Sequence, residues 1–468
     1  MKLEEEENIK GLFNLITNQI ESGRKKVIDY KTPEELNEEF DFNIGKKGIQ
    51  MDDLLTSFKK YLDYSADTND VKFQNQLFQG FNAPAFMGEV ITALSNTSMY
   101  TYEVAPVATL MEMELVKKMC EKVGFLNGDG IFTTGGSNSN LMAMFTARNV
   151  KNPTIKAQGN RSTVLTGFVS ENAHYSFKNA ANMIGIGSAN LKKVKVDEHD
   201  KMDTNHLMEE IKKSKERGEV PFFIAATAGT TMRGAYDRIE ILADIAEKEN
   251  VWLHVDGSFG GSIVLSETHK VLMKGAERAD SVAWNPHKLM NIPLICSMLL
   301  MKKDGLLEWN NSDINTDYIY HENETQNYDL GKKSVQCGRK VDSLKLWSAW
   351  KYFGDEGYEK RIDTLIENAT YFESQIIKNP NFELLAARES FAVCFRFKSD
   401  TGDRNQISIN LRESLREKGE LIINYGYIDS KVALRFVSVN PDLTHNDIDF
   451  FIGLMEKEGL LQRNITLN

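Results

Sequence analysis

A lysine and an aspartate each follow a short apolar run, where a buried strand would end. Lys288 stands behind His287 and the run Ser281–Trp284, and Asp256 follows the run Val251–Val255. A lysine held at such a place can form a Schiff base once it loses its proton, which burial near other cations favours. A carboxylate after an apolar strand is costly to bury unless it has a cationic partner. Alone, such a lysine is more often a surface residue and such an aspartate a helix cap; together they indicate a reactive site.

A glycine-rich segment ahead of a helical pattern predicts an anion cradle. The run Gly130–Thr133 is followed by Gly135, Gly136, Ser137 and Asn138, and a helical pattern begins at Leu141. Glycines and hydroxyl groups before a helix expose backbone N–H groups that bind phosphate. The segment is not a P-loop, because no Gly-Lys-Ser/Thr sequence follows it.

Two more candidates come after other apolar runs. The flat imidazole of His174 could stack on a cofactor ring, although a lone histidine is more often structural. The hydroxyl groups of Thr227–Thr231 could reach a cofactor or a substrate, although such a segment is also a plain loop. We interpret His254 as a packing residue that points away from Asp256.

Taken in chain order, these features match the needs of one cofactor, pyridoxal 5′-phosphate (PLP). The glycine-rich segment would hold its phosphate, and His174 would stack on its ring. Asp256 would keep a proton on the pyridine nitrogen, so that the ring can accept electrons. Lys288 would hold the cofactor as a Schiff base, and the 32 residues from Asp256 to Lys288 leave room for one helix and one strand. The sequence therefore predicts a PLP enzyme anchored at Lys288.

The elements that must position these residues are short apolar runs separated by helical patterns. Such a pattern predicts an α/β fold with a mostly parallel central sheet. Functional residues of such a sheet collect at the carboxyl ends of the strands, which is where the candidates fall. The expected strands are Gly130–Thr133, Thr163–Val169, Phe222–Ala226, Val251–Val255, Ser281–Trp284 and Cys296–Met301.

The pattern divides the chain into three parts. We expect residues 1–75 to form a helical segment, residues 76–345 a large PLP-binding domain and residues 346–468 a small α+β domain. The elements expected in the first and last parts are helices Ile9–Ile20, Met51–Tyr64, Leu346–Phe353 and Asn446–Glu458, and strands Phe391–Phe397 and Val432–Val439.

The bulk composition narrows the class of protein. The chain has 468 residues and a formal net charge of −11. Binders of nucleic acid or anionic membranes need a basic face, so we expect neither partner. The four cysteines are scattered without a CxxC pair, so we predict neither a metal site nor a disulfide framework. An acidic N-terminus without an apolar core, and no apolar stretch of membrane-spanning length, favour a cytoplasmic protein.

Segments along most of the chain resemble the glutamate, cysteine sulfinate and aspartate branch of the PLP-dependent decarboxylases. That branch has the aspartate-aminotransferase-like fold, fold type I. The resemblance runs from about residue 10 to the C-terminus. It is carried by Gln74–Phe78, Tyr100–Pro106, Thr227–Thr231, Asn285–Lys288, Gln336–Arg339, Leu434–Phe436 and Thr444–Phe450.

The resemblance implies a role for each matching residue. Lys288, Asp256 and His174 would be the catalytic residues, as Schiff-base lysine, pyridine partner and ring stacker. Gln76 would contact the substrate, and the fork-shaped cation of Arg435 would bind its distal acidic group. The resemblance also implies a homodimer with active sites at the interface, wrapped by the N-terminal helices. The remaining cofactor-binding residues would be Gly136, Ser137, Asn138, Thr231, Ser258, Asn285 and His287.

Phe78 bears on the choice of substrate. Glutamate-directed members of the branch have a small residue here, whereas cysteine sulfinate and aspartate members have Phe, and Ser258 also occurs in that group. A ring at this position would shorten the pocket. The resemblance therefore favours α-decarboxylation of L-aspartate to β-alanine or of cysteine sulfinate to hypotaurine over glutamate decarboxylation to GABA. The Lys- and Asn-rich composition, typical of a bacterial chain, favours aspartate.

The segment 318–331 departs from the pattern of the branch. Relatives carry a loop tyrosine that reprotonates Cα, but this loop is about two residues shorter and no tyrosine falls at that place. Tyr320, His321 or Glu324 could substitute. If none does, the chain would be a decarboxylation-dependent transaminase or an aldehyde-forming PLP enzyme. A PLP-binding protein without turnover is the third alternative.

Overall fold

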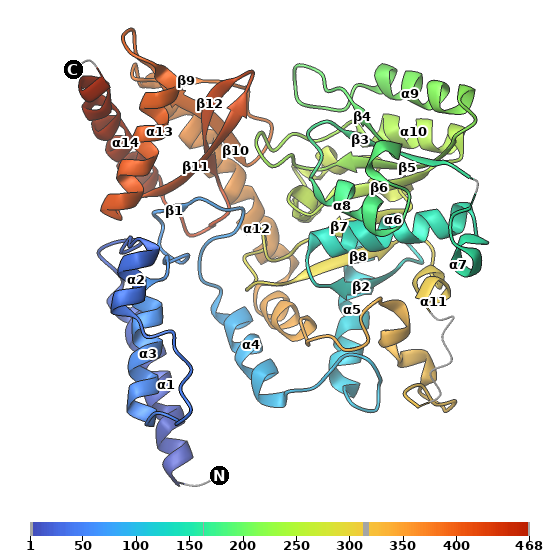
Figure 1. Ribbon diagram of the computed structural model, residues 1–468, viewed down its shortest axis with the longest axis horizontal. Coiled ribbons are helices and arrows are strands. Elements are labelled where there is room, and N and C mark those ends of the chain that lie inside the picture. The colour runs from blue at the N-terminus through green and yellow to red at the C-terminus, as the bar shows by residue number, and fades with distance from the viewer. Residues whose placement is uncertain (1–2, 162, 312–317, 467–468) are drawn as a thin grey trace. The chain divides into compact units, whose positions relative to one another are not determined.

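The computed structural model describes residues 3–161, 163–311 and 318–466, and the chain forms two compact units (Figure 1). The larger unit comprises Phe81–Glu367 with the short segment Ala387–Ala392. The smaller unit joins the residues up to Gly80 to Asn368–Ala386 and the chain from Val393 onward. The two units are defined by contacts within a single chain. They do not test the three domains expected from the sequence, which stay a prediction. Among the described residues, no helix is long and apolar enough to span a membrane.

The larger unit is built on a seven-stranded sheet in which the strand order is β2-β8-β7-β6-β5-β3-β4. β8 runs antiparallel to both neighbours, and the other adjacent pairs are parallel. All six strands expected from apolar runs are present, and β4 was missed because Leu-Lys-Lys-Val is a polar edge strand. The strands are β2 (Asp129–Thr133), β3 (Leu165–Ser170), β4 (Leu191–Val194), β5 (Val220–Thr227), β6 (Trp252–Gly257), β7 (Ser281–Trp284) and β8 (Ser297–Met301).

Helices cover both faces of this sheet, α6 and α8 on one side and α9 and α10 on the other (Figure 1). The chain crosses the sheet in one direction from β2 to β4 and in the opposite direction from β4 to β6. Because such crossovers are right-handed, the connecting helices of the two passes cover opposite faces. The helices are α4 (Ala83–Ser95), α5 (Pro106–Val123), α6 (Gly136–Lys151), α7 (Ile155–Gln158), α8 (Ser176–Met183), α9 (Thr204–Glu216), α10 (Ile239–Glu249), α11 (Leu306–Asn311) and the first part of α12 (Ser343–Lys378).

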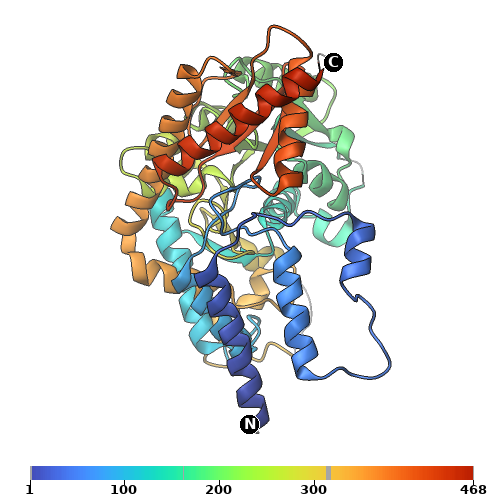
Figure 2. The same ribbon diagram turned by 90° about the vertical axis from the view of Figure 1, so that its left-hand side faces the viewer.

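The smaller unit has a five-stranded sheet in which residues from both ends of the chain meet. β1 pairs in parallel with β11, Phe73 opposite Ile422, which ties the segment around Phe73 to the C-terminal strands. Helices α13 and α14 lie side by side (Figure 2). The strands are β1 (Phe73–Gln74), β9 (Phe382–Leu384), β10 (Ala392–Phe397), β11 (Ile422–Ile428) and β12 (Lys431–Val437), and the helices are α1 (Leu3–Ser22), α2 (Pro33–Glu39), α3 (Met51–Tyr64), α13 (Arg404–Lys418) and α14 (His445–Thr466).

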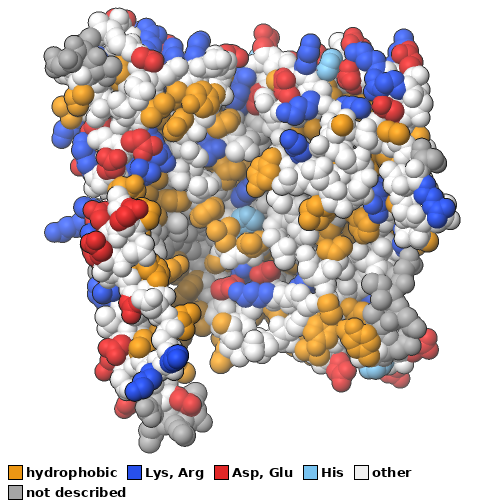
Figure 3. Space-filling model, in the orientation of Figure 1, with side chains coloured by type: hydrophobic (Ala, Val, Ile, Leu, Met, Phe, Trp, Pro, Cys, Tyr) orange, Lys and Arg blue, Asp and Glu red, His pale blue; other side chains and the backbone are white. Residues whose placement is uncertain are grey.

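Charged side chains are mixed on the surface. In the described part of the face drawn in Figure 3, basic and acidic side chains are interspersed, and no continuous basic area is visible.

A buried ion pair closes the free edge of the sheet beside the glycine-rich segment. Within the described residues β2 pairs with β8 alone, so the backbone groups on its outer side have no neighbouring strand there. Glu112 and Arg339 are 3.0 Å apart, with side chains 1% and 3% exposed. The Glu112 carboxylate accepts from the Phe132 N–H at 3.2 Å, and Arg339 donates to the Phe132 carbonyl at 3.2 Å. This pair therefore fixes the backbone of β2 just before the predicted anion cradle.

We expect Arg339→Met to destabilise the protein by about 3 kcal/mol, because it leaves the buried Glu112 carboxylate without its cation. Urea unfolding would measure the change. The double variant Glu112→Gln/Arg339→Met should recover part of it, since no buried charge is then left alone. Lys270→Met, at an exposed surface pair, is the control and should leave the unfolding midpoint unchanged. Equal losses in the single and double variants would contradict this account.

Candidate active site

A cavity of about 230 Å³ lies at the carboxyl ends of the parallel strands of the larger unit. Its wall is formed by the segments that follow β2, β3, β5, β6 and β7, as expected for an α/β sheet. A larger cavity, of about 610 Å³, includes Trp252 at the start of β6 and contains none of the predicted site residues. The smaller cavity is lined by Gly136, Ser137, Asn140, Asn172, His174, Tyr175, Thr227, Gly229, Thr231, Asp256, Ser258, Phe259, Asn285 and Lys288.

Eight of the predicted site residues line this cavity together. They are Gly136, Ser137, His174, Thr231, Asp256, Ser258, Asn285 and Lys288. Two predicted cofactor residues do not line it. The Asn138 side chain accepts from the Thr134 N–H at 3.4 Å, and the buried His287 ring lies 2.6 Å from the Cys296 carbonyl oxygen. His287 therefore supports the backbone beside Lys288.

Asp256 is buried and held by directional contacts at the end of β6. Its Oδ2 accepts from the Asn140 side-chain amide at 2.9 Å, and its Oδ1 accepts from the Ser258 N–H at 3.1 Å. The oxygen of the same Asn140 amide lies 2.9 Å from His254 Nε2, and His254 Nδ1 lies 2.8 Å from the Ser281 hydroxyl. A chain of contacts thus links β7, β6 and α6 to this carboxylate.

The expectation that His254 points away from Asp256 is wrong. Residues two apart on a strand face the same side, so His254 and Asp256 share one face of β6. Both also bind one amide, that of Asn140. His254 is structural in the sense that it orients Asn140, and burial lowers its pKa to about 4, which keeps the ring neutral at pH 7.

The electrostatics of the cavity favour an ionised Asp256 and a neutral His174. Burial raises the pKa of Asp256, but the hydrogen bonds from Ser258 and Asn140 and the electrostatic interactions with His254 and Lys288 outweigh it, so that this pKa lies below its usual value. Burial lowers the pKa of His174, and Lys288 acts in the same direction while Asp256 opposes it. The cavity therefore offers a carboxylate and a flat neutral ring.

The glycine-rich segment has little room for side chains, as a phosphate cradle would require. Gly135 has φ +126°, which L side chains rarely adopt, and it precedes α6 directly. A Cβ on Gly136 would lie 2.4 Å from the Ser258 hydroxyl and 2.8 Å from the Asn285 side-chain nitrogen. The buried hydroxyl groups of Thr227 and Ser258 have no hydrogen-bond partner within the described chain. Hydroxyl groups without a partner can donate to a phosphate and an ionised carboxylate can accept from a protonated pyridine nitrogen, so these residues fit PLP.

The three predicted substrate residues lie in the smaller unit. Arg435 on β12 is 3% exposed and donates to the Asn75 carbonyl at 3.1 Å. Phe78 packs near Phe73, with ring centroids 6.1 Å apart, and Gln76 is exposed. The fold thus brings Gln76, Phe78 and Arg435 into one unit, and their roles stay predictions.

None of the three substitutes for the loop tyrosine lines the cavity. His321 and Glu324 are exposed, and Tyr320 is half-buried with its hydroxyl beside Gly331. Burial raises the pKa of Tyr320 to about 12, so the phenol keeps its proton. Residues 312–317, which precede this segment, lie outside the described residues.

The sequence reasoning missed several residues of the cavity. Asn140 was detectable, because it lies one helical turn beyond Gly136 and Ser137 and so faces the same side of α6. Asn172, Tyr175 and Phe259 flank the predicted residues in the chain, but only the turns after β3 and β6 bring them to the wall. Local pattern carries no signal for such turns.

Comparisons with known proteins agree with this geometry. Residues 33–398 match the model of the pyridoxal-dependent decarboxylase conserved domain. Rat cysteine sulfinic acid decarboxylase is 39% identical, covering 93% of this chain and 91% of its own, and an acidic amino acid decarboxylase of Xenopus tropicalis is 36% identical, covering 96% and 91%. The crystal structure of mouse CSAD in apo form superposes with a TM-score of 0.93 at 38% identity, covering 97% of this chain and 98% of that one.

We expect Gly136→Ala to weaken PLP binding by about tenfold or more, because its methyl group would enter the cradle and collide with Ser258. A titration followed by PLP fluorescence would measure the dissociation constant. Gly136→Ala/Ser258→Ala, which removes the hydroxyl in the way, should bind better than the single variant. Gly453→Ala, where a Cβ meets nothing within 4 Å, is the matched control. Wild-type affinity in Gly136→Ala would remove this segment from the site.

Proposed function

The chain belongs to the pyridoxal-dependent decarboxylase family, and from that premise we propose that it removes the α-carboxylate of a short acidic amino acid, cysteine sulfinate or aspartate. Family membership confirms the predicted fold class, PLP as cofactor and a carboxy-lyase as the class of enzyme. The observation that carries the choice of substrate is likeness to cysteine sulfinic acid and acidic amino acid decarboxylases over more than nine-tenths of this chain.

The residues of the cavity can be assigned to steps of such a reaction. Lys288 Nζ would hold the cofactor covalently and yield its place to the substrate amine. Asp256, ionised and fixed by Asn140, would keep a proton on the pyridine nitrogen. The neutral His174 imidazole would stack on the ring and hold it flat. When bound, PLP supplies the electron sink that accepts the bonding pair as CO₂ leaves.

The distal acid group of the substrate would be bound by Arg435. Burial lowers the pKa of Arg435, but a guanidinium keeps its charge at neutral pH and presents donors in a planar fork. A buried cation of this kind matches a carboxylate or sulfinate better than a neutral side chain. Phe78, a large ring in the same unit, would limit the length of the acid that fits.

The substrate assignment is tested by one assay on three acids. We expect CO₂ release from aspartate and cysteine sulfinate to exceed release from glutamate, with the amine as product. Lys288→Ala should lose the visible absorbance of the covalently held cofactor. Aldehyde formed together with pyridoxamine phosphate would instead indicate an altered outcome, caused by the missing loop tyrosine.

We expect Phe78→Ser to raise the ratio of kcat/KM for glutamate over aspartate by about tenfold, since one methylene of pocket length is worth that much. Phe42→Ser is the control, because Phe42 is an exposed ring in the same unit. An unchanged ratio in Phe78→Ser would show that this ring does not set the length of the pocket.

We also propose that the chain is a homodimer. α4 exposes Met87, Ile91 and Leu94, the last 80% accessible, and α5 exposes Val107 and Leu110. Rows of apolar side chains on two helices are unusual on the surface of a monomer and typical of an interface. We expect a second copy of the chain to cover these rows, because enzymes with this fold are typically dimers.

We expect Leu94→Glu to shift the protein from dimer to monomer. Burying an unpaired carboxylate costs about 3 kcal/mol, which raises the dimer dissociation constant by about a hundredfold. Sedimentation velocity at micromolar concentration would report the shift. Leu126→Glu, at a leucine 90% exposed outside these rows, should stay dimeric. A Leu94→Glu protein that remains dimeric would place the interface elsewhere.

A further inference from the structure

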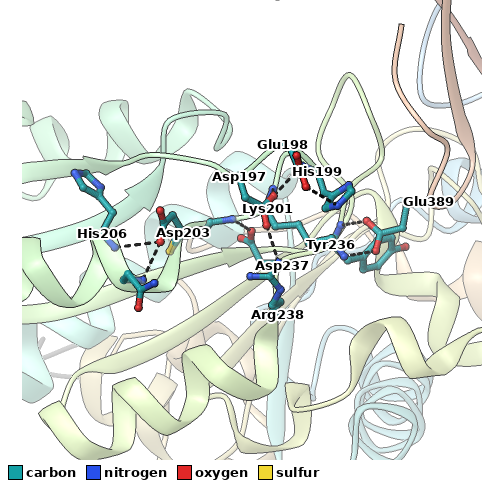
Figure 4. A network of polar contacts seen from close by, with 12 residues as sticks. Asp197, Glu198, His199, Lys201, Asp203, His206, Tyr236, Asp237, Arg238 and Glu389 are labelled. Carbon is teal, nitrogen blue, oxygen red and sulfur yellow. Dashed lines mark hydrogen bonds and ion pairs between the residues drawn. The ribbon is translucent and has the colours of Figure 1, made fainter. Parts of the chain in front are cut away.

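The turn between β4 and α9 carries a dense set of charged side chains that the proposed reaction does not use. In Figure 4, Glu389 reaches Lys201 and Tyr236, and Asp237 lies beside the turn. Lys201 Nζ is 2.5 Å from a Glu389 oxygen, and the other Glu389 oxygen accepts from the Tyr236 N–H at 3.0 Å. These contacts hold the turn against the segment that follows β5.

Asp200 occupies the centre of this turn in an unusual conformation. It has φ +66° and is 5% exposed. One carboxylate oxygen accepts from the Asn172 side-chain amide, and the other accepts from the Thr230 hydroxyl at 2.8 Å. Asn172 follows β3 and lines the cavity, and Thr230 stands between two cavity residues, Gly229 and Thr231. One buried carboxylate thus joins two loops of the cavity wall.

Asp237 makes a parallel connection a few residues away. It is 4% exposed, and its two oxygens accept from the Met202 N–H at 2.6 Å and the Thr227 N–H at 2.7 Å. Burial raises the pKa of Asp237 to about 6, and the nearby Asp200 acts in the same direction while Lys201 opposes it. Thr227, whose own hydroxyl has no hydrogen-bond partner among the described residues, lines the cavity. Both carboxylates therefore fasten the turn to cavity residues.

We propose that Asp200 is a positioning residue of the cofactor site, which sets the orientation of the Asn172 amide and of the Thr230–Thr231 segment. This inference rests on the proposed function. The Asn172 side-chain nitrogen donates to Asp200, which fixes the orientation of this amide in the cavity wall. Asp200 also accepts from the Thr230 hydroxyl, which accepts in turn from the Ala235 N–H at 3.2 Å, and these two contacts fix the residue that precedes Thr231 in the cavity wall.

The two acceptor atoms of Asp200 explain why an amide could not replace it. Asparagine has almost the same shape and tolerates the left-handed backbone, but only one of its two terminal atoms accepts a hydrogen bond. In Asp200→Asn one partner meets a donor instead of an acceptor. The Asn172 amide then turns over and offers a donor to the cavity, or Thr230 rotates.

The experiment compares cofactor binding in four variants of the full chain. Asp200→Asn should weaken PLP binding about tenfold and change the visible circular dichroism of the bound cofactor, while the urea midpoint stays close to that of the wild type. Asn172→Ala should have a similar effect, and Asp200→Asn/Asn172→Ala should be no worse than either alone, because both act through one contact.

The matched control is Asp203→Asn, in the same turn and with the same loss of charge. Asp203 caps α9 by accepting from the Asn205 and His206 N–H groups, a role that asparagine fills equally well. Wild-type dichroism and affinity in Asp200→Asn, or strictly additive losses in the double variant, would overturn the proposal. Failure of the proposed function would be seen separately. In that case Lys288→Ala would keep the visible cofactor absorbance of the wild-type protein.

Discussion

The site depends on one buried carboxylate that must stay ionised. Asp256 sits in the larger unit where burial alone would favour its protonated form. Hydrogen bonds from Ser258 and Asn140 help to offset that cost, and the neutral His254 ring, itself in contact with Ser281, holds Asn140 in place. Two strands and one helix meet in these contacts. Their relative placement is therefore fixed by the same atoms that fix the charge, and the other walls of the cavity assemble around it.

Around this fixed centre, the cavity has walls of two kinds. β6 and β7 lie in the middle of the sheet; Asp256 is buried at the end of β6, and Lys288, half-buried, follows β7. The segments after β3 and β5 carry more exposed residues, such as Asn172 and Thr231, which are ordered by side-chain contacts from outside the sheet. Asp256 is thus positioned by the strand that carries it, whereas Asn172 is positioned by a side-chain contact with Asp200.

Much of this arrangement could be predicted, and the failures have identifiable causes. The six buried strands can be predicted from apolar runs in the sequence. Residues near their ends, such as Lys288 and Asp256, can be placed in one site because the carboxyl ends of parallel strands meet at one edge of the sheet. Helix α2 was overlooked although Thr32 and Glu35 form a capping box that the sequence displays. The edge strand β4 and the irregular β11 have no such pattern. His287 and Asp200 act through contacts with other segments, which spacing along the chain does not encode.

The Glu112–Arg339 pair also affects how readily the free edge of the sheet can aggregate. An edge strand with free N–H and C=O groups is a template on which a strand of another molecule can add. At Phe132 both groups are already engaged by buried side chains, so an incoming strand finds no ladder to extend there. The ion pair thus protects the protein from edge-to-edge aggregation. This hazard is greatest during folding, while the mostly parallel sheet is still assembling.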